Sequence, residues 1–131
     1  MKKGINSLII GAGKEQIYFI KEAKKLGINI IALDESPIAE GLNFVDIPIV
    51  IDIKDEKRVI EIAKKYNINF VIPAPIGNLI TLTGVVNKAL KLKGSSKNQA
   101  EIFANKDKFT EFKIKNNFYN PKEFLLNSPN K

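Results

Sequence analysis

The side chains that could carry chemistry in this sequence are carboxylates, lysines, hydroxyls and amides, because cysteine and histidine are both absent. Thiolate nucleophiles, disulfides, imidazole metal ligands and a Ser-His-Asp triad are therefore excluded. Arg58 is the only arginine beside 20 lysines, so the chain has little capacity for bidentate phosphate clamps. Asp46 and Asp52 bracket an expected strand and lack the spacing of a catalytic or metal-binding pair. The sequence predicts no catalytic residue and no metal ligand.

The clearest candidate for a binding site is a glycine turn, in which Gly11 and Gly13 follow the apolar run 7–10. Backbone N–H groups at such a turn attract anions, because they are unpaired and the helix dipole reinforces them. In the dinucleotide fingerprint G-x-G-x-x-G, the third glycine is replaced here by Gln16, which weakens a nicotinamide-cofactor interpretation. Asp34 stands where that fingerprint expects a ribose-binding acid. A purely structural turn followed by a strand-terminal acid remains an open alternative.

A third segment, 73–78 with the sequence P-A-P-I-G-N, should reach the same place. Ligands on parallel sheets bind beyond the carboxyl ends of the strands, and this segment follows an expected strand. Asn78 would also be explained as the N-cap of the helix that follows it. The residues predicted to bind substrate are Gly11, Gly13, Gln16, Asp34, Gly77 and Asn78.

The elements that must position these residues alternate between buried strands and amphipathic helices. The expected strands are 7–10, 28–33, 45–53 and 70–72, and the expected helices are 15–26, 55–66 and 78–92. Two segments, 23–31 and 63–71, repeat one order: helix end, left-handed residue (Gly27, then Asn67), buried strand. Strands buried on both faces and joined by helices predict a three-layer α/β/α sandwich with a mostly parallel, Rossmann-like sheet. Pro48 predicts an edge position for the third strand.

The last part of the chain has a different pattern. Two short helices are expected at 98–104 and 107–117, followed by a break at 118–121 and a lone strand at 122–126. We therefore predict a Rossmann-like domain over 1–97, and linker helices with the start of a further domain over 98–131. The apolar residues of the second part should need a partner, namely a following domain or a second copy of the chain. These residues are Ile102, Phe103, Phe109, Phe112, Phe118, Phe124 and Leu125.

The order of these segments resembles the N-terminal, pre-ATP-grasp domain of ATP-grasp ligases, such as biotin carboxylase, the carbamoyl phosphate synthetase large subunit and phosphoribosylglycinamide synthetase. The segments that carry the resemblance are the strand-G-A-G-helix start, the strand ending in Asp34, the V-D-x-x-x-x-x-D run from Val45 to Asp52, K-G-S-S at 93–96, A-N-K-D-K-F at 104–109 and N-P at 120–121. The resemblance implies a substrate-binding domain of a carboxylate-amine ligase that is not catalytic alone. The alternative is a stand-alone nucleotide- or dinucleotide-binding Rossmann domain.

The resemblance also implies roles for residues and cofactors. Lys106 matches the lysine of the family's D-K or S-K dipeptide, which helps to bind the ATP phosphates, although Asn105 stands in place of the acid. The family's glycine-rich lid and magnesium-binding residues would lie beyond residue 131. ATP and Mg²⁺ are therefore expected to serve the full-length ligase, and neither is expected to bind tightly to this chain, which we interpret as a truncated piece.

The net charge of +7 does not point to nucleic acid. Ile, Lys and Asn together make up 55 of the 131 residues, so the basic excess follows a general composition bias rather than a local patch. No apolar run approaches the roughly 20 residues of a membrane span, and the N-terminus lacks the pattern of a signal peptide. We expect a cytoplasmic protein with a small-molecule substrate and without nucleic-acid or membrane partners.

Overall fold

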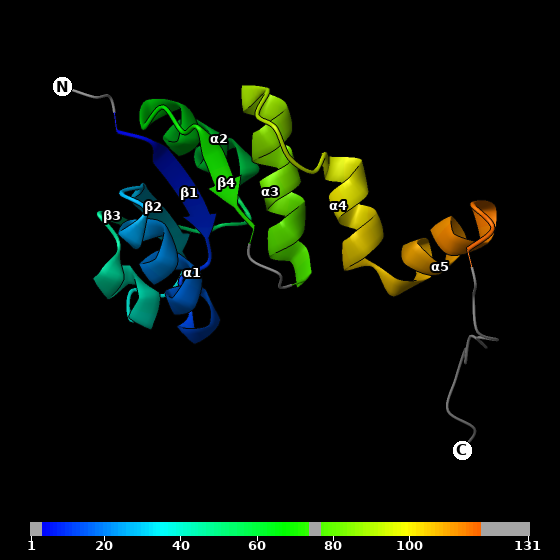
Figure 1. The fold of residues 1–131 in the computed structure, drawn as a ribbon, viewed down its shortest axis with the longest axis horizontal. Coiled ribbons are helices and arrows are strands. Elements are labelled where there is room, and N and C mark those ends of the chain that lie inside the picture. The colour runs from blue at the N-terminus through cyan, green and yellow to red at the C-terminus, as the bar shows by residue number, and fades with distance from the viewer. Residues whose placement is uncertain (1–3, 74–76, 119–131) are drawn as a thin grey trace, which may run out of the picture.

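The computed structural model describes residues 4–73 and 77–118, which form a sheet with helices on both faces and a helical extension (Figure 1). The strands are β1 (Asn6–Ile10), β2 (Asn29–Asp34), β3 (Ile47–Val50) and β4 (Phe70–Ile72). The helices are α1 (Lys14–Lys25), α2 (Glu56–Lys65), α3 (Gly77–Leu90), α4 (Lys97–Ala104) and α5 (Lys106–Lys115), with a 3₁₀ turn η1 (Glu40–Phe44). The predicted α/β fold class is confirmed.

The sheet has the strand order β3-β2-β1-β4, and every neighbouring pair is parallel. Leu8 in the central strand β1 lies opposite Ile31 of β2 and Val71 of β4. The edge position predicted for the strand that contains Pro48 is confirmed. This strand is shorter than the predicted 45–53, because the apolar alternation beyond Val50 reflects side chains packed on the core rather than strand pairing.

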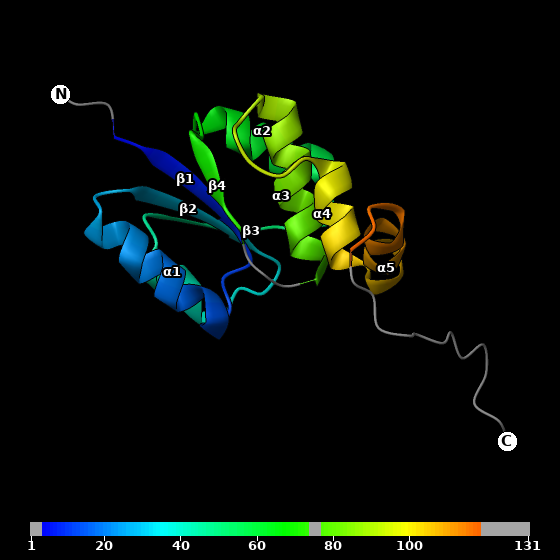
Figure 2. The ribbon, with the colours of Figure 1, turned by 45° about the vertical axis from the view of Figure 1, so that its right-hand side comes forward.

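Helices cover both faces of the sheet (Figure 2), and an apolar cluster on each face holds the layers together. Helices α2 and α3 cover one face and bury Val59, Ile62 and Val86 against the strands. Helix α1 covers the other face together with η1, an element that the sequence analysis did not predict. The side chains of β1 supply both clusters, because successive residues of a strand point to opposite faces.

Helices α1 and α2 are followed by left-handed residues at the predicted positions. Gly27 and Asn67 both have positive φ, +75° and +48°, as expected for left-handed residues after α1 and α2. Asn78 is not the cap of α3, because the helix already begins at Gly77 and Asn78 belongs to its first turn. The helical spacing of Ile17, Ile20, Ala23 and Leu26 in the sequence predicts that these four residues share the inward face of α1. This prediction is partly wrong, since Leu26 is 78% exposed and Gln16 takes a buried position instead.

Helices α4 and α5 extend away from the sheet. Helix α4 packs closely on α3, where a Cβ on Gly84 would lie 2.7 Å from the backbone nitrogen of Lys97. Helix α5 packs on α4, and none of its residues is buried. The predicted domain boundary at 97/98 stays a prediction, and the predicted strand 122–126 lies outside the described residues. Along residues 4–73 and 77–118, no helix combines the length and apolarity that crossing a bilayer requires.

Candidate functional site

The glycine turn between β1 and α1 is held by backbone and side-chain contacts with the end of β2. Gly11 has φ +88°, and its N–H donates to the carbonyl oxygen of Leu33 at 2.7 Å. The N–H of Ala12 donates to Oδ2 of Asp34 at 2.6 Å. A Cβ on Gly11 would lie 2.8 Å from Cδ1 of Leu79, the third residue of α3. Three segments that are distant in sequence therefore meet at the carboxyl edge of the sheet.

Asp34 uses both carboxylate oxygens to fix this edge. Oδ2 accepts from Ala12 N–H, and Oδ1 accepts from the backbone N–H of Ser36 at 2.8 Å. Hydrogen bonds from backbone N–H groups to a carboxylate are charge-assisted and strong. The acid predicted as a ribose ligand thus acts in this structure as a clamp between the glycine turn and the loop after β2.

The N-terminus of α1 is open at this turn. Its N-cap, Gly13, has an extended backbone (φ −71°, ψ −175°) and supplies no side-chain acceptor for the first N–H groups of the helix. Because φ is negative, Gly13 does not depend on glycine for its backbone conformation. Lys14 forms an exposed ion pair with Glu40 of η1, with Nζ and Oε1 3.3 Å apart. The free N–H groups at this end of α1 can receive an acceptor from a ligand.

Gln16 lies beneath the turn and is 2% exposed. Its Nε2 atom is buried and has no hydrogen-bond partner among the described residues. Its Oε1 atom lies 3.1 Å from the position that a Cβ on Gly13 would take, so the amide sits directly beside the N-cap. The sequence analysis selected Gln16 as the replacement of a glycine and as a substrate-binding residue, and it did not predict that Gln16 is buried. Its spacing of four and seven residues from Ile20 and Ala23 was the signal for burial on the same face of α1.

Gly41 belongs to the same site and was missed by the sequence analysis. Its N–H donates to the carbonyl oxygen of Ala12 at 2.7 Å, and a Cβ on Gly41 would lie 2.6 Å from that oxygen. The first turn of η1 therefore presses directly on the glycine turn. A glycine inside the loop 35–46 was the available signal, but nothing local indicated which backbone approaches it.

The first turn of α3 comes only partly into the site. Leu79 lies against Gly11, whereas Gly77 is exposed, with φ +42° and nothing within 4 Å of its Cβ position. The side chain of Asn78 lies outside the described part of the structure. The described contacts bring Gly11, Gly13, Gln16 and Asp34 to one turn, and the substrate-binding roles predicted for these four residues and for Gly77 and Asn78 all stay predictions.

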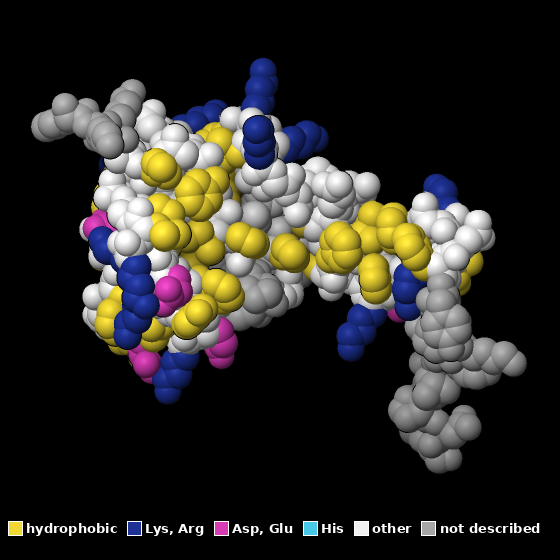
Figure 3. Space-filling model, in the orientation of Figure 1, with side chains coloured by type: hydrophobic (Ala, Val, Ile, Leu, Met, Phe, Trp, Pro, Cys, Tyr) yellow, Lys and Arg dark blue, Asp and Glu magenta, His cyan; other side chains and the backbone are white. Residues whose placement is uncertain are grey.

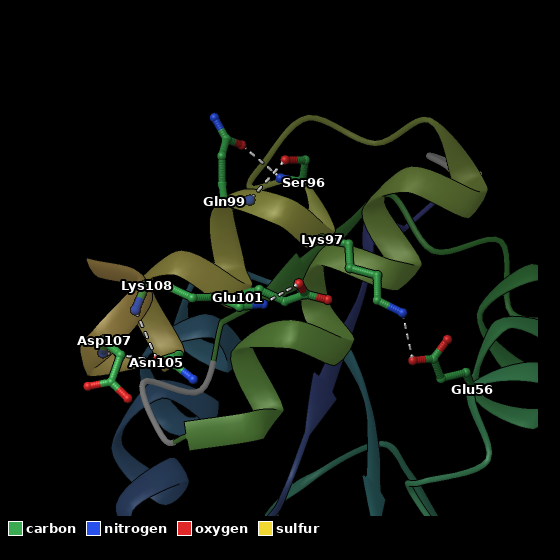
Figure 4. A network of polar contacts seen from close by, with 8 residues as sticks. All are labelled: Glu56, Ser96, Lys97, Gln99, Glu101, Asn105, Asp107 and Lys108. Atoms are coloured by element: carbon green, nitrogen blue, oxygen red, sulfur yellow. Dashed lines mark hydrogen bonds and ion pairs between the residues drawn. The ribbon is translucent and has the colours of Figure 1, made fainter. Parts of the chain in front are cut away.

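A second feature is a groove of about 420 Å³ between the start of α2, the middle of α3 and the junction of α4 with α5. Two ion pairs border it, Lys97–Glu56 at 3.2 Å and Lys108–Glu101 at 3.1 Å (Figure 4). At the junction, Oδ1 of Asn105 accepts from the N–H groups of Asp107 and Lys108, at 2.9 and 3.0 Å.

Asn105 is therefore the N-cap of α5, a role that Asp also fills well. Lys106, which the resemblance implies to be an ATP ligand, is the first residue of α5 and is exposed. None of the described contacts joins Lys106 to the glycine turn. The two predicted binding regions are thus separate within the described chain.

An aromatic surface formed by Phe103, Phe109, Phe112 and Phe118 runs along α4 and α5 (Figure 3). These rings pair with one another, with centroids 5.6 Å apart for Phe103–Phe109 and 6.2 Å apart for Phe112–Phe118. Each ring nevertheless remains between 37% and 63% exposed. The described part of the chain thus leaves a continuous apolar surface uncovered.

The sequence and the fold match known proteins. Residues 7–94 match the family described as PylC-like, N-terminal domain. A formate-dependent phosphoribosylglycinamide formyltransferase from Prochlorococcus marinus strain MIT 9515 is 35% identical over 66 residues, which are 50% of this chain and 17% of that protein. The crystal structure of phosphoribosylglycinamide synthetase from Anaerococcus prevotii matches with a TM-score of 0.76 at 28% identity, over 88% of this chain and 30% of that one.

More distant structures share the fold alone. N5-carboxyaminoimidazole ribonucleotide synthetase from Thermotoga maritima matches with a TM-score of 0.73 at 24% identity, over 95% of this chain and 34% of that one. The ADP complex of N5-carboxyaminoimidazole synthetase from Staphylococcus aureus matches with a TM-score of 0.64 at 17% identity, over 88% of this chain and 30% of that one.

The chain thus spans about a third of these solved structures. The resemblance to N-terminal domains of ATP-grasp ligases is confirmed by the fold match and by the relative at 28% identity. The family match covers more than half of the chain. The protein therefore belongs to the family of PylC-like N-terminal domains and has the fold of the N-terminal domains of ATP-grasp ligases.

Proposed function

We propose that this chain binds and orients the small-molecule substrate of an ATP-dependent ligase that joins a carboxylate to an amine. The observation that carries the proposal is the glycine turn, which Asp34 clamps at the carboxyl edge of the sheet beside the open N-terminus of α1. Parallel α/β sheets bind ligands at this edge. Holding one reactant in a fixed orientation is a contribution to catalysis that needs no reactive side chain in this domain.

Lys106 is the only residue of this chain to which we assign a contact with ATP. The exposed ammonium group of Lys106 at the first position of α5 can reach the phosphates of a nucleotide held by a following domain. Within residues 4–73 and 77–118, no three acidic side chains gather in a way that could hold a metal ion, so Mg²⁺ is assigned to no residue here. By itself the chain is expected neither to hydrolyse ATP nor to form a bond.

The aromatic surface on α4 and α5 fits the same proposal. In a whole ligase, we assign its four rings to the contact with the following domain of the polypeptide. Burying such rings is worth roughly 1.5–3 kcal/mol each, so they would hold the two domains in a fixed relation. Self-association of the separate chain through this surface is the second outcome that the exposed rings favour.

The test is a binding titration with phosphoribosylglycinamide, the molecule that the names of two relatives contain, followed by NMR of the backbone amides. Binding should shift the signals of Gly11, Gly13 and Ser36. Gly13→Val should abolish these shifts without unfolding the chain, because its φ is open to valine and its Cβ would meet only side-chain atoms.

A matched control is Gly84→Ala, which disturbs the α3–α4 contact far from the turn. Micromolar binding of NAD or NADP at the same amides would instead favour the dinucleotide-binding alternative. Steady-state ATP hydrolysis by the purified chain, lost in a Lys106→Ala variant, would contradict the assignment of a non-catalytic domain.

A further inference from the structure

Helices α4 and α5 meet at a single residue, Asn105. This residue is both the C-cap of α4 and the N-cap of α5, and its backbone is extended (φ −115°, ψ 117°). Its N–H donates to the carbonyl oxygen of Glu101 in α4 at 3.1 Å, and its carbonyl oxygen accepts from the N–H of Phe109 in α5 at 2.9 Å. Its side-chain Oδ1 accepts from two N–H groups of α5 (Figure 4). These hydrogen bonds end one helix and begin the next without tying the two helices to each other.

This arrangement leaves the φ torsion of Asn105 free to change. The N–H of Asn105 lies on the α4 side of its N–Cα bond, whereas its side chain and its carbonyl group lie on the α5 side. A rotation about that bond therefore turns α5 relative to α4 and keeps all of the hydrogen bonds of Asn105. The extended region allows φ from about −60° to −160°, so a change of about 40° from the observed value needs no strained backbone.

The side-chain contacts that join the two helices restrain this rotation only weakly. Glu101 and Lys108 form an ion pair at 3.1 Å across the junction, but both side chains are partly exposed. The rings of Phe103 and Phe109, which also face each other across the junction, are partly exposed as well. Exposed ion pairs contribute little, and rings that stay in contact with water bury too little area to fix an orientation.

Space for a movement lies between the helices themselves. A groove of about 310 Å³ runs between α4 and α5, lined by Asn98 and Ile102 from α4 and by Glu111, Phe112 and Lys115 from α5. Closely packed helices interdigitate their side chains and leave no such hollow. None of the residues of α5, which the structure describes throughout, is buried. Helix α5 therefore rests against α4 without being locked into it.

We propose that Asn105 is a hinge about which α5 swings as an arm, and that the swing opens and closes the groove between α4 and α5. A terminal residue of a helix that absorbs a change in torsion is the usual site of such a hinge. This inference goes beyond the proposed function and does not depend on the binding role of the glycine turn. Lys106, the residue next to the hinge, moves least, so a contact made by its ammonium group can be kept while the arm turns.

The experiment measures distances between two spin labels on the full chain by double electron–electron resonance. The chain contains no cysteine, so introduced cysteines are the only labelled positions. Lys64→Cys places one label on an exposed position of α2, and the second is placed by Asn98→Cys on α4 or by Ile114→Cys on α5. The nine residues from Asn105 to Ile114 span about 13 Å of helix, so a swing of about 40° moves the label on α5 by up to about 9 Å. The α2–α5 distance distribution should be at least about twofold wider than the α2–α4 distribution.

Two variants should widen the α2–α5 distribution further. Asn105→Gly keeps a residue that is accepted at an N-cap and enlarges the range of φ at the junction. Glu101→Gln removes the ion pair with Lys108 that joins the two helices. Circular dichroism checks that each variant keeps its helices.

The matched control is Glu56→Gln. It breaks an ion pair of similar length and exposure, Lys97–Glu56 at 3.2 Å, which joins the first residue of α4 to α2 and does not cross the junction. Because α4 is also packed closely on α3 at Gly84, this substitution should leave the α2–α5 distribution unchanged.

Three results would overturn the hinge. The first is an α2–α5 distribution as narrow as the α2–α4 one. The second is a wide α2–α5 distribution that Glu56→Gln widens and that Asn105→Gly and Glu101→Gln leave unchanged, because the movement would then lie between α4 and the sheet. The third is a wide distribution without helical carbon chemical shifts for residues 106–115, because α5 would then unfold rather than swing.

Discussion

The carboxyl edge of the sheet and the α4–α5 extension differ in how far contacts within the chain fix and bury their residues. At the edge, backbone and side chains are fixed by contacts within the chain: Asp34 holds Ala12, Gly41 presses on the same residue and Leu79 covers Gly11. Along α4 and α5, Ala100 is the only buried residue, and the four rings of the aromatic surface stay at least one third exposed. The contacts within the described chain account for the edge, whereas they leave the rings of the extension uncovered.

The two regions are expected to contribute differently to the domain, the sheet to its folding stability and the extension to its association with a partner. Strong contacts at the edge fit the proposed binding role, because a turn that binds substrate has to keep its shape when it is empty. Apart from the close packing of α4 on α3, the contacts along the extension are local caps, pairs of partly exposed rings and exposed ion pairs. Exposed ion pairs contribute little to the stability of the whole. Substitutions should therefore affect folding at the sheet and association at the extension.

The largest expected effect separates the two regions directly. Leu8→Ala removes a fully buried side chain from the central strand and should lower the free energy of unfolding by about 2–5 kcal/mol. Phe103→Ala removes a larger but 63% exposed side chain and should change it by no more than about 0.5 kcal/mol. Urea unfolding followed by circular dichroism measures both. A loss for Phe103→Ala as large as that for Leu8→Ala would contradict the division.

The second prediction tests the glycine turn against an open glycine. Gly11→Ala combines a left-handed backbone with a Cβ only 2.8 Å from Cδ1, at the flexible end of the Leu79 side chain, and should cost about 2–3 kcal/mol. Gly27→Ala is the control, because Gly27 has a similar φ of +75° but nothing within 4 Å of its Cβ position. The control should cost about 1–2 kcal/mol.

Thermal unfolding of these two variants gives the difference. If they lose the same stability, Leu79 gives way easily and the turn is less firmly fixed than the structure indicates. A further variant, Leu79→Ala combined with Gly11→Ala, should recover the part of the loss that comes from the contact.

The success of sequence reasoning follows the same division between local and distant contacts. The strands, the helices, Gly27 and Asn67 were predicted because periodicity and left-handed residues are local signals. Gly41 was missed, and the hydrogen bond between Asp34 and Ala12 was not predicted, because the partner of each lies in another segment. The substrate-binding role of Asp34 stays a prediction. The inward face of α1 was misplaced because Gln16 is polar, although its spacing from Ile20 placed it on the buried face.

The sequence allowed the location of the candidate site to be predicted, but not the contacts of its individual groups. The rule that ligands meet the carboxyl ends of parallel strands brought Gly11 and Asp34 to the same edge, as the structure has them. The rule says nothing about which groups are satisfied within the chain. The structure adds that the carboxylate of Asp34 accepts two backbone hydrogen bonds, whereas the Nε2 atom of Gln16 has no partner among the described residues.

A third, smaller effect concerns the extension. Asn105→Ala removes the cap that receives two N–H groups of α5 and should destabilise that helix locally by about 1 kcal/mol. Asn105→Asp is the control, since aspartate keeps the acceptor and favours the helix dipole. Hydrogen exchange should speed up for the amides of α5 in the alanine variant and not for those of β1. Faster exchange in β1 would show that α5 is coupled to the sheet more tightly than its contacts indicate.

The exposed rings of the aromatic surface also lead us to expect that two copies of the chain associate through the extension. Light scattering at high micromolar concentration should detect a dimer of the full chain if the aromatic surface binds a second copy. Phe109→Ser together with Phe112→Ser should reduce that association, whereas Tyr18→Ser, a substitution of an exposed ring on α1, should not. A monomer in every case would leave the following domain of a ligase as the proposed occupant.

The smallest expected effect concerns Asp46, at the opposite edge of the sheet from the glycine turn. Burial raises the pKa of Asp46, but hydrogen bonds from the Lys24 ammonium and from the backbone N–H of Ile30, at 2.7 Å, outweigh it, so the pKa lies below its usual value of 3.8. The folded protein thus holds the ionised form more tightly than the unfolded chain does. The resulting stability is present above about pH 5 and is lost as the pH falls below about 4.

Because both side chains of the Lys24–Asp46 pair are partly exposed, Asp46→Asn should cost no more than about 0.5–1 kcal/mol at neutral pH. The variant should also lose part of the decline in stability between about pH 5 and pH 2. Glu61→Gln is the control, because Glu61 pairs with Arg58 on the surface and both side chains are at least 60% exposed. Unfolding curves at a series of pH values test this. An unchanged acid limb in Asp46→Asn would mean that the network around the start of β2 gives the sheet no pH-dependent stability, and that its hydrogen bond to Ile30 serves only to set the register of that strand.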